Sequence, residues 1–142
     1  MRITLTTLQQ HVKNNNKFSV LTCYDATFAK ILEGAGVDVL LVGDSLGNVL
    51  KGESTTLSVT LDDMIYHTRC VSSGSNRALI MADMPFGSYQ QSPQQAFDNA
   101  SKILAAGAHM VKIEGGQVMA ETTAFLTQRG IPVCAHIGLM PQ

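Results

Sequence analysis

The chain has 142 residues, of which 45% are hydrophobic and 15% are charged, and its formal net charge is −1. This composition supplies the core of a single domain and excludes a disordered chain. No basic stripe or acidic tail is present, which argues against nucleic acid and anionic membranes as partners. No apolar run approaches the roughly 18 residues of a membrane span, and the first residues lack the apolar segment of a signal peptide.

The cysteines, Cys23, Cys70 and Cys134, are odd in number, widely spaced and form no C-x-x-C motif. This pattern argues against a disulfide framework and against a zinc site, and it is typical of a protein in a reducing compartment. We therefore expect a cytoplasmic location.

Apolar spacing and helix-capping residues predict helices and strands in alternation. The elements expected in the first half are a helix over 5–13, a strand over 18–22, a helix from the cap Asp25 to 33, a strand over 37–42 and a long loop over 43–59. Those expected in the second half are a helix over 61–71 capped by Thr60, a strand over 78–82, a helix from Ser92-Pro93 to 106, a strand over 110–113, a helix over 117–128 and a strand over 132–136.

This alternation predicts an α/β fold with a parallel sheet and helices outside it. Two architectures fit: an open five-stranded sheet of the flavodoxin type, and about the first five strands of a (β/α)8 TIM barrel. We favour the barrel, because an open sheet normally covers its last strand with a helix, whereas the sequence stops at Gln142, soon after the last strand. Barrels need about 250 residues. We expect residues 1–142 to be the N-terminal portion of one barrel domain that continues past Gln142.

Acidic residues end three consecutive predicted strands: Asp44, Asp83 and Glu114. Active sites of parallel α/β folds lie at the carboxyl ends of the strands. One aspartate after a strand is usually a turn former or helix cap, but three converging carboxylates would repel one another and raise each other's pKa. A divalent cation removes this conflict, and ligands that are all oxygen favour Mg²⁺.

Two further residues extend this candidate site. Lys112 is two positions before Glu114 on one strand, so both side chains share a face. An inward lysine needs an anion, and a substrate carboxylate would supply one. His136 ends the last predicted strand and is either a core histidine or a site residue. Tyr24 is interpreted as packing.

Five segments, in order along the whole chain, resemble the ketopantoate hydroxymethyltransferase family. They are LTCYD (21–25), LVGDSLG (41–47), ADMPF (82–86), MVKIEGG (110–116) and VCAHIGLMPQ (133–142). The resemblance implies a Mg²⁺-dependent (β/α)8 barrel of the phosphoenolpyruvate/pyruvate superfamily. It implies transfer of a hydroxymethyl group from 5,10-methylenetetrahydrofolate to 3-methyl-2-oxobutanoate, by way of an enolate that Mg²⁺ stabilises, to form 2-dehydropantoate (ketopantoate) in pantothenate biosynthesis. It also implies a large homo-oligomer, typically a decamer.

By the same resemblance, Asp44 and Asp83 hold the metal, with Glu114 in its sphere directly or through water. Ser45 and Lys112 bind the 2-oxo acid together with the two aspartates, and His136 lines the site. The general-base glutamate of the family is expected beyond Gln142, so no catalytic base is assigned within the chain, and we expect this portion alone to be inactive. Two alternatives remain: another Mg²⁺-dependent 2-oxo acid C–C bond enzyme of the superfamily, and a half barrel that binds or assembles without turnover.

Overall fold

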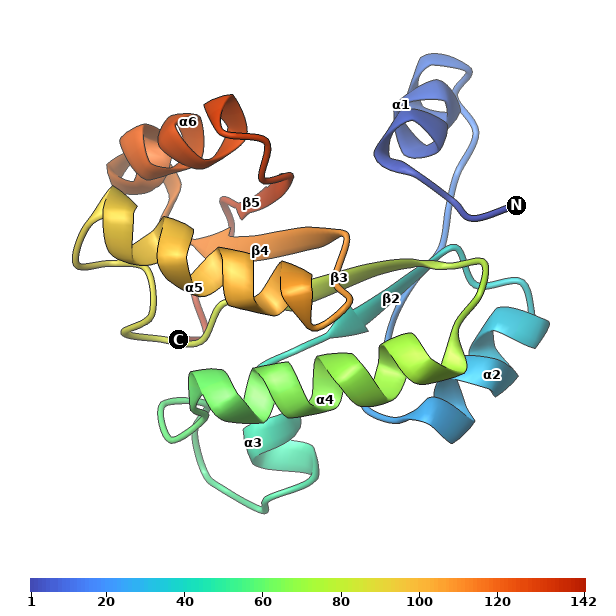
Figure 1. Ribbon diagram of the computed structural model, residues 1–142, viewed down its shortest axis with the longest axis horizontal. Helices are drawn as coiled ribbons and strands as arrows, with labels where there is room; N and C mark the ends of the chain where they lie inside the picture. The colour runs from blue at the N-terminus through green and yellow to red at the C-terminus, as the bar shows by residue number, and fades with distance from the viewer.

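The structure, a computed structural model, describes every residue from Met1 to Gln142. Its strands and helices alternate along the chain, with the helices packed around the sheet (Figure 1). The strands are β1 (Val20–Thr22), β2 (Val39–Val42), β3 (Leu79–Asp83), β4 (Met110–Glu114) and β5 (Val133–His136). The helices are α1 (Leu5–Lys13), α2 (Ala26–Gly34), α3 (Leu46–Val49), α4 (Leu61–Gly74), α5 (Pro93–Ala105) and α6 (Ala120–Gln128), with a 3₁₀ turn η1 (Gly116–Met119).

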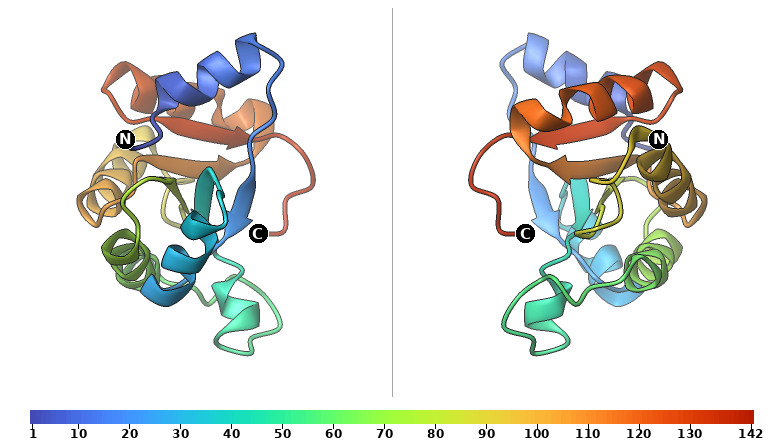
Figure 2. Two further views of the ribbon diagram at one scale, coloured as in Figure 1. Left: turned by 90° about the vertical axis from the view of Figure 1, so that its right-hand side faces the viewer. Right: turned by 90° about the vertical axis from the view of Figure 1, so that its left-hand side faces the viewer.

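The order of the strands decides between the two predicted architectures. They lie as β1-β2-β3-β4-β5, and every neighbouring pair is parallel. A flavodoxin-type sheet would have the order 2-1-3-4-5, because its chain reverses direction across the sheet. Figure 2 shows the sheet curving, with α2, α4, α5 and α6 following its outer side. The sheet is therefore part of a barrel, as the sequence predicted.

Predicted caps begin three of the helices. The Asp25 carboxylate accepts hydrogen bonds from the backbone N–H groups of Thr27 and Phe28, both at 2.8 Å. Thr60 forms a reciprocal capping box at the start of α4, and Ser92 caps α5 ahead of a proline at its first turn. Each cap satisfies N–H groups that have no partner inside the helix, and this fixes where the helix starts.

The structure differs from the predicted elements in three places. Helix α4 runs to Gly74, three residues beyond its predicted end at residue 71, because the serines expected to end it continue the helix. The loop predicted over 43–59 contains the short helix α3, which has no side-chain cap and so leaves no sequence signal. The region predicted as a helix from residue 117 begins with the 3₁₀ turn η1 and becomes α-helical only at Ala120; two glycines with positive φ lie at the start of η1, Gly115 as its cap and Gly116 as its first residue. The strands also start or end one or two residues away from their predicted bounds, as is usual for element ends.

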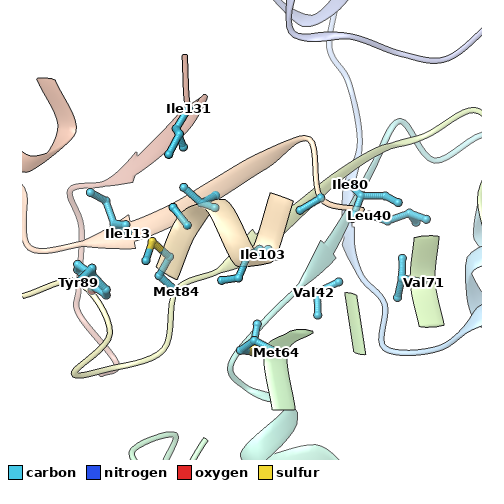
Figure 3. Close-up of a cluster of buried hydrophobic side chains, with 14 of the residues drawn as sticks. Leu40, Val42, Met64, Val71, Ile80, Met84, Tyr89, Ile103, Ile113 and Ile131 are labelled. Atoms are coloured by element: carbon cyan, nitrogen blue, oxygen red, sulfur yellow. The ribbon is translucent and has the colours of Figure 1, made fainter. Parts of the chain in front are cut away.

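Side chains alternate across the sheet and build two cores. Leu40, Val42, Ile80 and Ile113 point outward into the larger cluster, where they pack with helix residues such as Ile103 (Figure 3). Each of these five side chains is at most 1% exposed. Because successive residues of a strand face opposite sides, the residues between them face the concave side.

The concave side is apolar toward the amino ends of the strands. Val39, Leu79, Met81 and Met110 form a second cluster there with Leu8 of α1. A hollow of about 620 Å³ remains between α1 and the strands, with 11 hydrophobic residues among the 13 that line it. No helix is both long and apolar enough to cross a membrane.

Glu33, at the end of α2, fixes the entry to β3. Its carboxylate accepts hydrogen bonds from Ser75 Oγ (2.6 Å) and from the backbone N–H groups of Arg77 and Ala78 (2.9 Å each). Burial acts to raise the pKa of Glu33, but these hydrogen bonds and one from the N–H of Asn76 outweigh it and lower the pKa to about 2. The carboxylate of Glu33 thus connects the end of α2 to the start of β3.

Candidate metal and substrate site

The alternation of the strands also places the predicted site residues. Leu79 and Met81 face the concave side of β3, so Asp83, two positions further, faces it too. On β4, Met110 faces the same side and is followed at the same spacing by Lys112 and Glu114. The three polar side chains therefore continue an apolar face at its carboxyl end, where active sites of such folds lie.

Lys112 is the cation of the site. Its Nζ lies 2.8 Å from Asp83 Oδ1 and 3.6 Å from Glu114 Oε1, and the side chains of Lys112, Asp83 and Glu114 are 14%, 5% and 3% exposed. Burial acts to lower the pKa of Lys112, but the charges of Asp83, Glu114 and Asp44 raise it above its ordinary value. The lysine therefore stays charged, and it lies between two buried carboxylates.

Asp44 approaches the same cluster from the end of β2. Its backbone N–H donates to Asp83 Oδ2 at 3.1 Å, and the residue is 4% exposed. Burial and the charge of Asp83 raise the pKa of Asp44, against the opposing effects of Gln142 and Lys112. Burial also raises the pKa of Asp83, even though Lys112 opposes this shift. One ammonium group thus faces three buried acids, which is a deficit of positive charge.

Ser45 lies beside Asp44 and is oriented by Tyr24. The hydroxyl oxygens of Ser45 and Tyr24 are 2.8 Å apart. The backbone carbonyl of Tyr24 accepts a hydrogen bond from Nδ1 of His67, also at 2.8 Å. Besides the packing role expected from the sequence, Tyr24 has a hydroxyl contact with Ser45, one of the predicted site residues. Its position two residues after β1, at the carboxyl end of the strand, is the sequence signal for this contact.

Gly43 leaves room for this arrangement. A Cβ at this position would lie 2.9 Å from Ser45 Oγ, 3.6 Å from Asp83 Oδ2 and 3.8 Å from the Tyr24 hydroxyl. Any larger residue would push the serine hydroxyl away from its present place.

His136 is next to the site but outside its network of contacts. It is opposite Glu114 in the register of β4 and β5, and its side chain is half-buried. Its Nε2 hydrogen-bonds with the backbone carbonyl of Leu139 in the following segment. The predicted role of His136 in lining the site stays a prediction.

The donor atoms suit a hard divalent ion. Asp83 Oδ1 and Glu114 Oε2 are buried and receive no well-aligned hydrogen bond, although the former is in an ion pair with Lys112. Unpartnered buried carboxylate oxygens are costly, and a cation that binds oxygen would satisfy them. No group of three or more His, Cys, Asp or Glu side chains is arranged to hold a metal together. The three predicted ligands, Asp44, Asp83 and Glu114, thus lie at the same strand ends without forming a ready-made three-carboxylate site, and Lys112 Nζ stands between Asp83 and Glu114.

Comparison with known proteins identifies the family of the chain. A family model for ketopantoate hydroxymethyltransferase matches residues 2–142. The chain belongs to this family. The resemblance inferred from the five segments is thereby confirmed.

The chain is also similar to curated members of the family. It is 70% identical over 141 residues to a 3-methyl-2-oxobutanoate hydroxymethyltransferase of Nitrosomonas europaea, covering 99% of the chain and 52% of the relative. It is 66% identical to the enzyme of the same name from Nitrosospira multiformis, covering 100% of the chain and 54% of the relative. The chain thus spans about half the length of these relatives.

Solved structures share the fold at low identity. A 2,3-dimethylmalate lyase, a member of the PEP mutase/isocitrate lyase superfamily, matches with a TM-score of 0.67 and 21% identity, over 94% of the chain and 52% of the lyase. A phosphonopyruvate hydrolase solved with oxalate and Mg²⁺ matches with a TM-score of 0.70 and 15% identity, over 90% of the chain and 50% of the hydrolase. These matches confirm the predicted fold class.

Proposed function

We propose that the whole protein transfers a hydroxymethyl group from 5,10-methylenetetrahydrofolate to 3-methyl-2-oxobutanoate and forms 2-dehydropantoate for pantothenate biosynthesis. The observation that carries this proposal is the family match through residues 2–142, since relatives 60–70% identical have the name of this activity. The charged cluster at the strand ends supports it, because a 2-oxo acid needs both a cation for its carboxylate and a way to activate its keto group.

Asp44 and Asp83 would hold Mg²⁺, with Glu114 in its sphere directly or through water. Their raised pKa values and the unpartnered oxygen of Glu114 support this assignment, because a bound cation stabilises the ionised carboxylates. When bound, Mg²⁺ would supply Lewis acidity that polarises the keto oxygen and acidifies the proton on C3 of the substrate.

Lys112 would bind the carboxylate of the 2-oxo acid. It is charged and nearly buried, and Asp83 and Glu114 hold its Nζ at the carboxyl end of β4. An ammonium group that is withdrawn from water interacts strongly with an anion that reaches it. Ser45 Oγ, oriented by the Tyr24 hydroxyl, would donate a further hydrogen bond to the substrate.

None of the residues 1–142 is proposed as the base that removes the C3 proton. By resemblance to the family, that role would belong to a glutamate outside residues 1–142, and His136 would line the site beside it. We further propose that the full-length protein is a cytoplasmic homo-oligomer, with a decamer as the expected form.

Product analysis tests the reaction. The full-length protein, incubated with Mg²⁺, 3-methyl-2-oxobutanoate and 5,10-methylenetetrahydrofolate carrying ¹³C in its one-carbon unit, should yield 2-dehydropantoate labelled in the new hydroxymethyl group. The variant Lys112→Met should lose most of this activity, whereas Lys102→Met, which changes an exposed lysine of α5, should retain it.

A parallel incubation with 2,3-dimethylmalate and without folate addresses the two alternatives. A lyase of the superfamily would cleave 2,3-dimethylmalate without folate, and a half barrel that only assembles would form no product with either substrate. The relatives at 60–70% identity favour the transferase over both. Folate-independent cleavage, or no product from a correctly folded full-length protein, would overturn the proposal.

A further inference from the structure

Two polar residues that lie beyond the predicted site connect three of its strand ends. We infer that Tyr89 and Gln142 act together as a positioning pair that holds the carboxylate of Asp44 in the orientation that receives a divalent cation. This inference rests on the metal site of the proposed function, but neither residue would touch the metal or the substrate.

Tyr89 is the buried end of this connection. It follows β3, is 1% exposed, and its ring belongs to the outer core cluster together with Met84 and Ile113 (Figure 3). Its hydroxyl accepts the backbone N–H of Glu114 at 3.0 Å and lies 3.2 Å from the carbonyl of the same residue. It also lies 2.6 Å from Gln142 Oε1, and the shorter distance favours donation of its single proton to the glutamine.

Gln142 connects Tyr89 to Asp44 through hydrogen bonds of its side-chain amide. Its Nε2 donates to Asp44 Oδ2 at 2.7 Å and to the carbonyl of Met84 at 3.0 Å, while its Oε1 accepts from Tyr89. Turning the amide over would set Oε1 against two acceptors, the carboxylate of Asp44 and the carbonyl of Met84. The surrounding groups therefore permit one orientation of the amide.

This network has a direct consequence for Asp44. Its Oδ2 is engaged by Gln142, which restrains the rotation of the carboxylate and leaves Oδ1 as the oxygen without this contact, to which a cation could bind. The Tyr89 hydroxyl donates to Gln142 Oε1 at 2.6 Å and thereby holds the amide whose Nε2 engages Asp44 Oδ2. Partners that orient a metal ligand in this way typically change metal affinity by 10–100-fold when they are removed.

Metal binding without substrate tests the inference directly. Mn²⁺, which substitutes for Mg²⁺ at oxygen-ligand sites and is visible by electron paramagnetic resonance, would be titrated into the full-length protein in the absence of both substrates. The variants are Tyr89→Phe, Gln142→Leu and the double variant. The matched controls are Tyr66→Phe, which removes the hydroxyl of an exposed tyrosine, and Gln128→Leu on the exposed face of α6.

Each single variant should raise the Mn²⁺ Kd about tenfold. The double variant should raise the Kd no further than the weaker-binding single variant, because the same chain of hydrogen bonds is broken in all three proteins. At saturating Mg²⁺ the kcat of the single variants should return to within about threefold of wild type, a recovery that general structural damage would not allow. The controls should leave the Kd unchanged.

Three results would overturn the inference: an unchanged Mn²⁺ Kd in Gln142→Leu, effects that multiply in the double variant, or a wild-type protein that binds no Mn²⁺. If Tyr89→Phe does not fold, Gln142→Leu decides alone. A wild-type protein that binds Mn²⁺ but makes no product would overturn the proposed function instead, and the Kd values would still decide the role of the pair.

Discussion

Lys112 and Asp83 face each other directly across the β3–β4 ladder, with Lys112 Nζ 2.8 Å from Asp83 Oδ1. The one ammonium group of the site and a carboxylate proposed to hold the metal are therefore neighbours before any ligand arrives. The carboxylates of Asp83 and Glu114 therefore compete with the carboxylate of a substrate for the charge of Lys112. A divalent cation bound to these acidic side chains would compensate their charge and leave Lys112 available to the substrate.

The first prediction concerns the variant Lys112→Met. Without a divalent cation, this change leaves Asp83 and Glu114 buried with no counter-charge, and breaking such a buried pair costs on the order of 3 kcal/mol of unfolding free energy. With saturating Mg²⁺, the loss should shrink to about 1 kcal/mol, because the cation then compensates the carboxylates. Urea unfolding with EDTA and with Mg²⁺ measures both values, with Lys102→Met as the control. An equal loss in both conditions would show that Mg²⁺ does not bind beside Asp83.

The second prediction concerns pH and Glu33. Because the folded-state pKa is about 2 and the ordinary value is 4.5, the ionised carboxylate stabilises the fold fully above pH 4.5, and this stabilisation is lost as the pH falls toward 2. Glu33→Gln should therefore lower the unfolding free energy by about 2 kcal/mol at neutral pH and by progressively less below pH 4.5. Thermal unfolding across this window measures the difference. Glu121→Gln, an exposed change in α6, is the control, and a loss for Glu33→Gln that is independent of pH would contradict the assignment.

The third prediction concerns Gly43→Ala. The added methyl group would meet Ser45 Oγ at 2.9 Å, and the hydroxyl can turn away, so the expected loss of stability is small, about 1 kcal/mol. The Tyr24–Ser45 contact should be lost, and the KM for the 2-oxo acid should rise about tenfold, which corresponds to one hydrogen bond of about 1.4 kcal/mol. Gly34→Ala is the control, since no atom lies within 4 Å of the added carbon there. An unchanged KM would remove Ser45 from the substrate site.

The fourth prediction concerns Gly74, the last residue of α4. A Cβ at this position would lie 2.3 Å from the backbone carbonyl oxygen of Ala26, which cannot turn aside as a side chain can. Gly74→Ala should therefore force α2 and α4 apart and lower the unfolding free energy by about 3 kcal/mol. Chemical denaturation beside Gly34→Ala measures this loss. A stability equal to that of Gly34→Ala would mean that the two helices are not in close contact.

The sequence was sufficient for the arrangement of the site's acids because the strand period is two. Once β3 and β4 were assigned, the positions of Asp83, Lys112 and Glu114 at the ends of buried strands followed, and so did their common face. The caps Asp25 and Thr60 likewise depend on neighbours a few residues away, so local sequence predicts them well.

The sequence was not sufficient for contacts that join distant loops. Tyr89 reaches Glu114 and Gln142, and Gln142 reaches Asp44 across 98 positions, and no spacing rule connects such residues. The sequence did not predict the short helix α3. Its backbone hydrogen bonds join residues three or four positions apart in a Gly- and Ser-rich segment, and no side chain caps its start. Tertiary contacts, rather than local preference, decide both features.

The most direct test of the account is exchange of the C3 proton of 3-methyl-2-oxobutanoate with solvent deuterium, followed by proton NMR with the full-length protein and without folate. Removal of this proton is the step that the charged cluster of Asp44, Asp83, Lys112 and Glu114 is proposed to assist. We expect exchange that requires Mg²⁺, stops with EDTA and falls at least about 100-fold in Asp83→Asn, in line with the loss of a metal ligand. Exchange that proceeds equally without a divalent cation, or no exchange in a protein shown to have bound Mg²⁺, would contradict it.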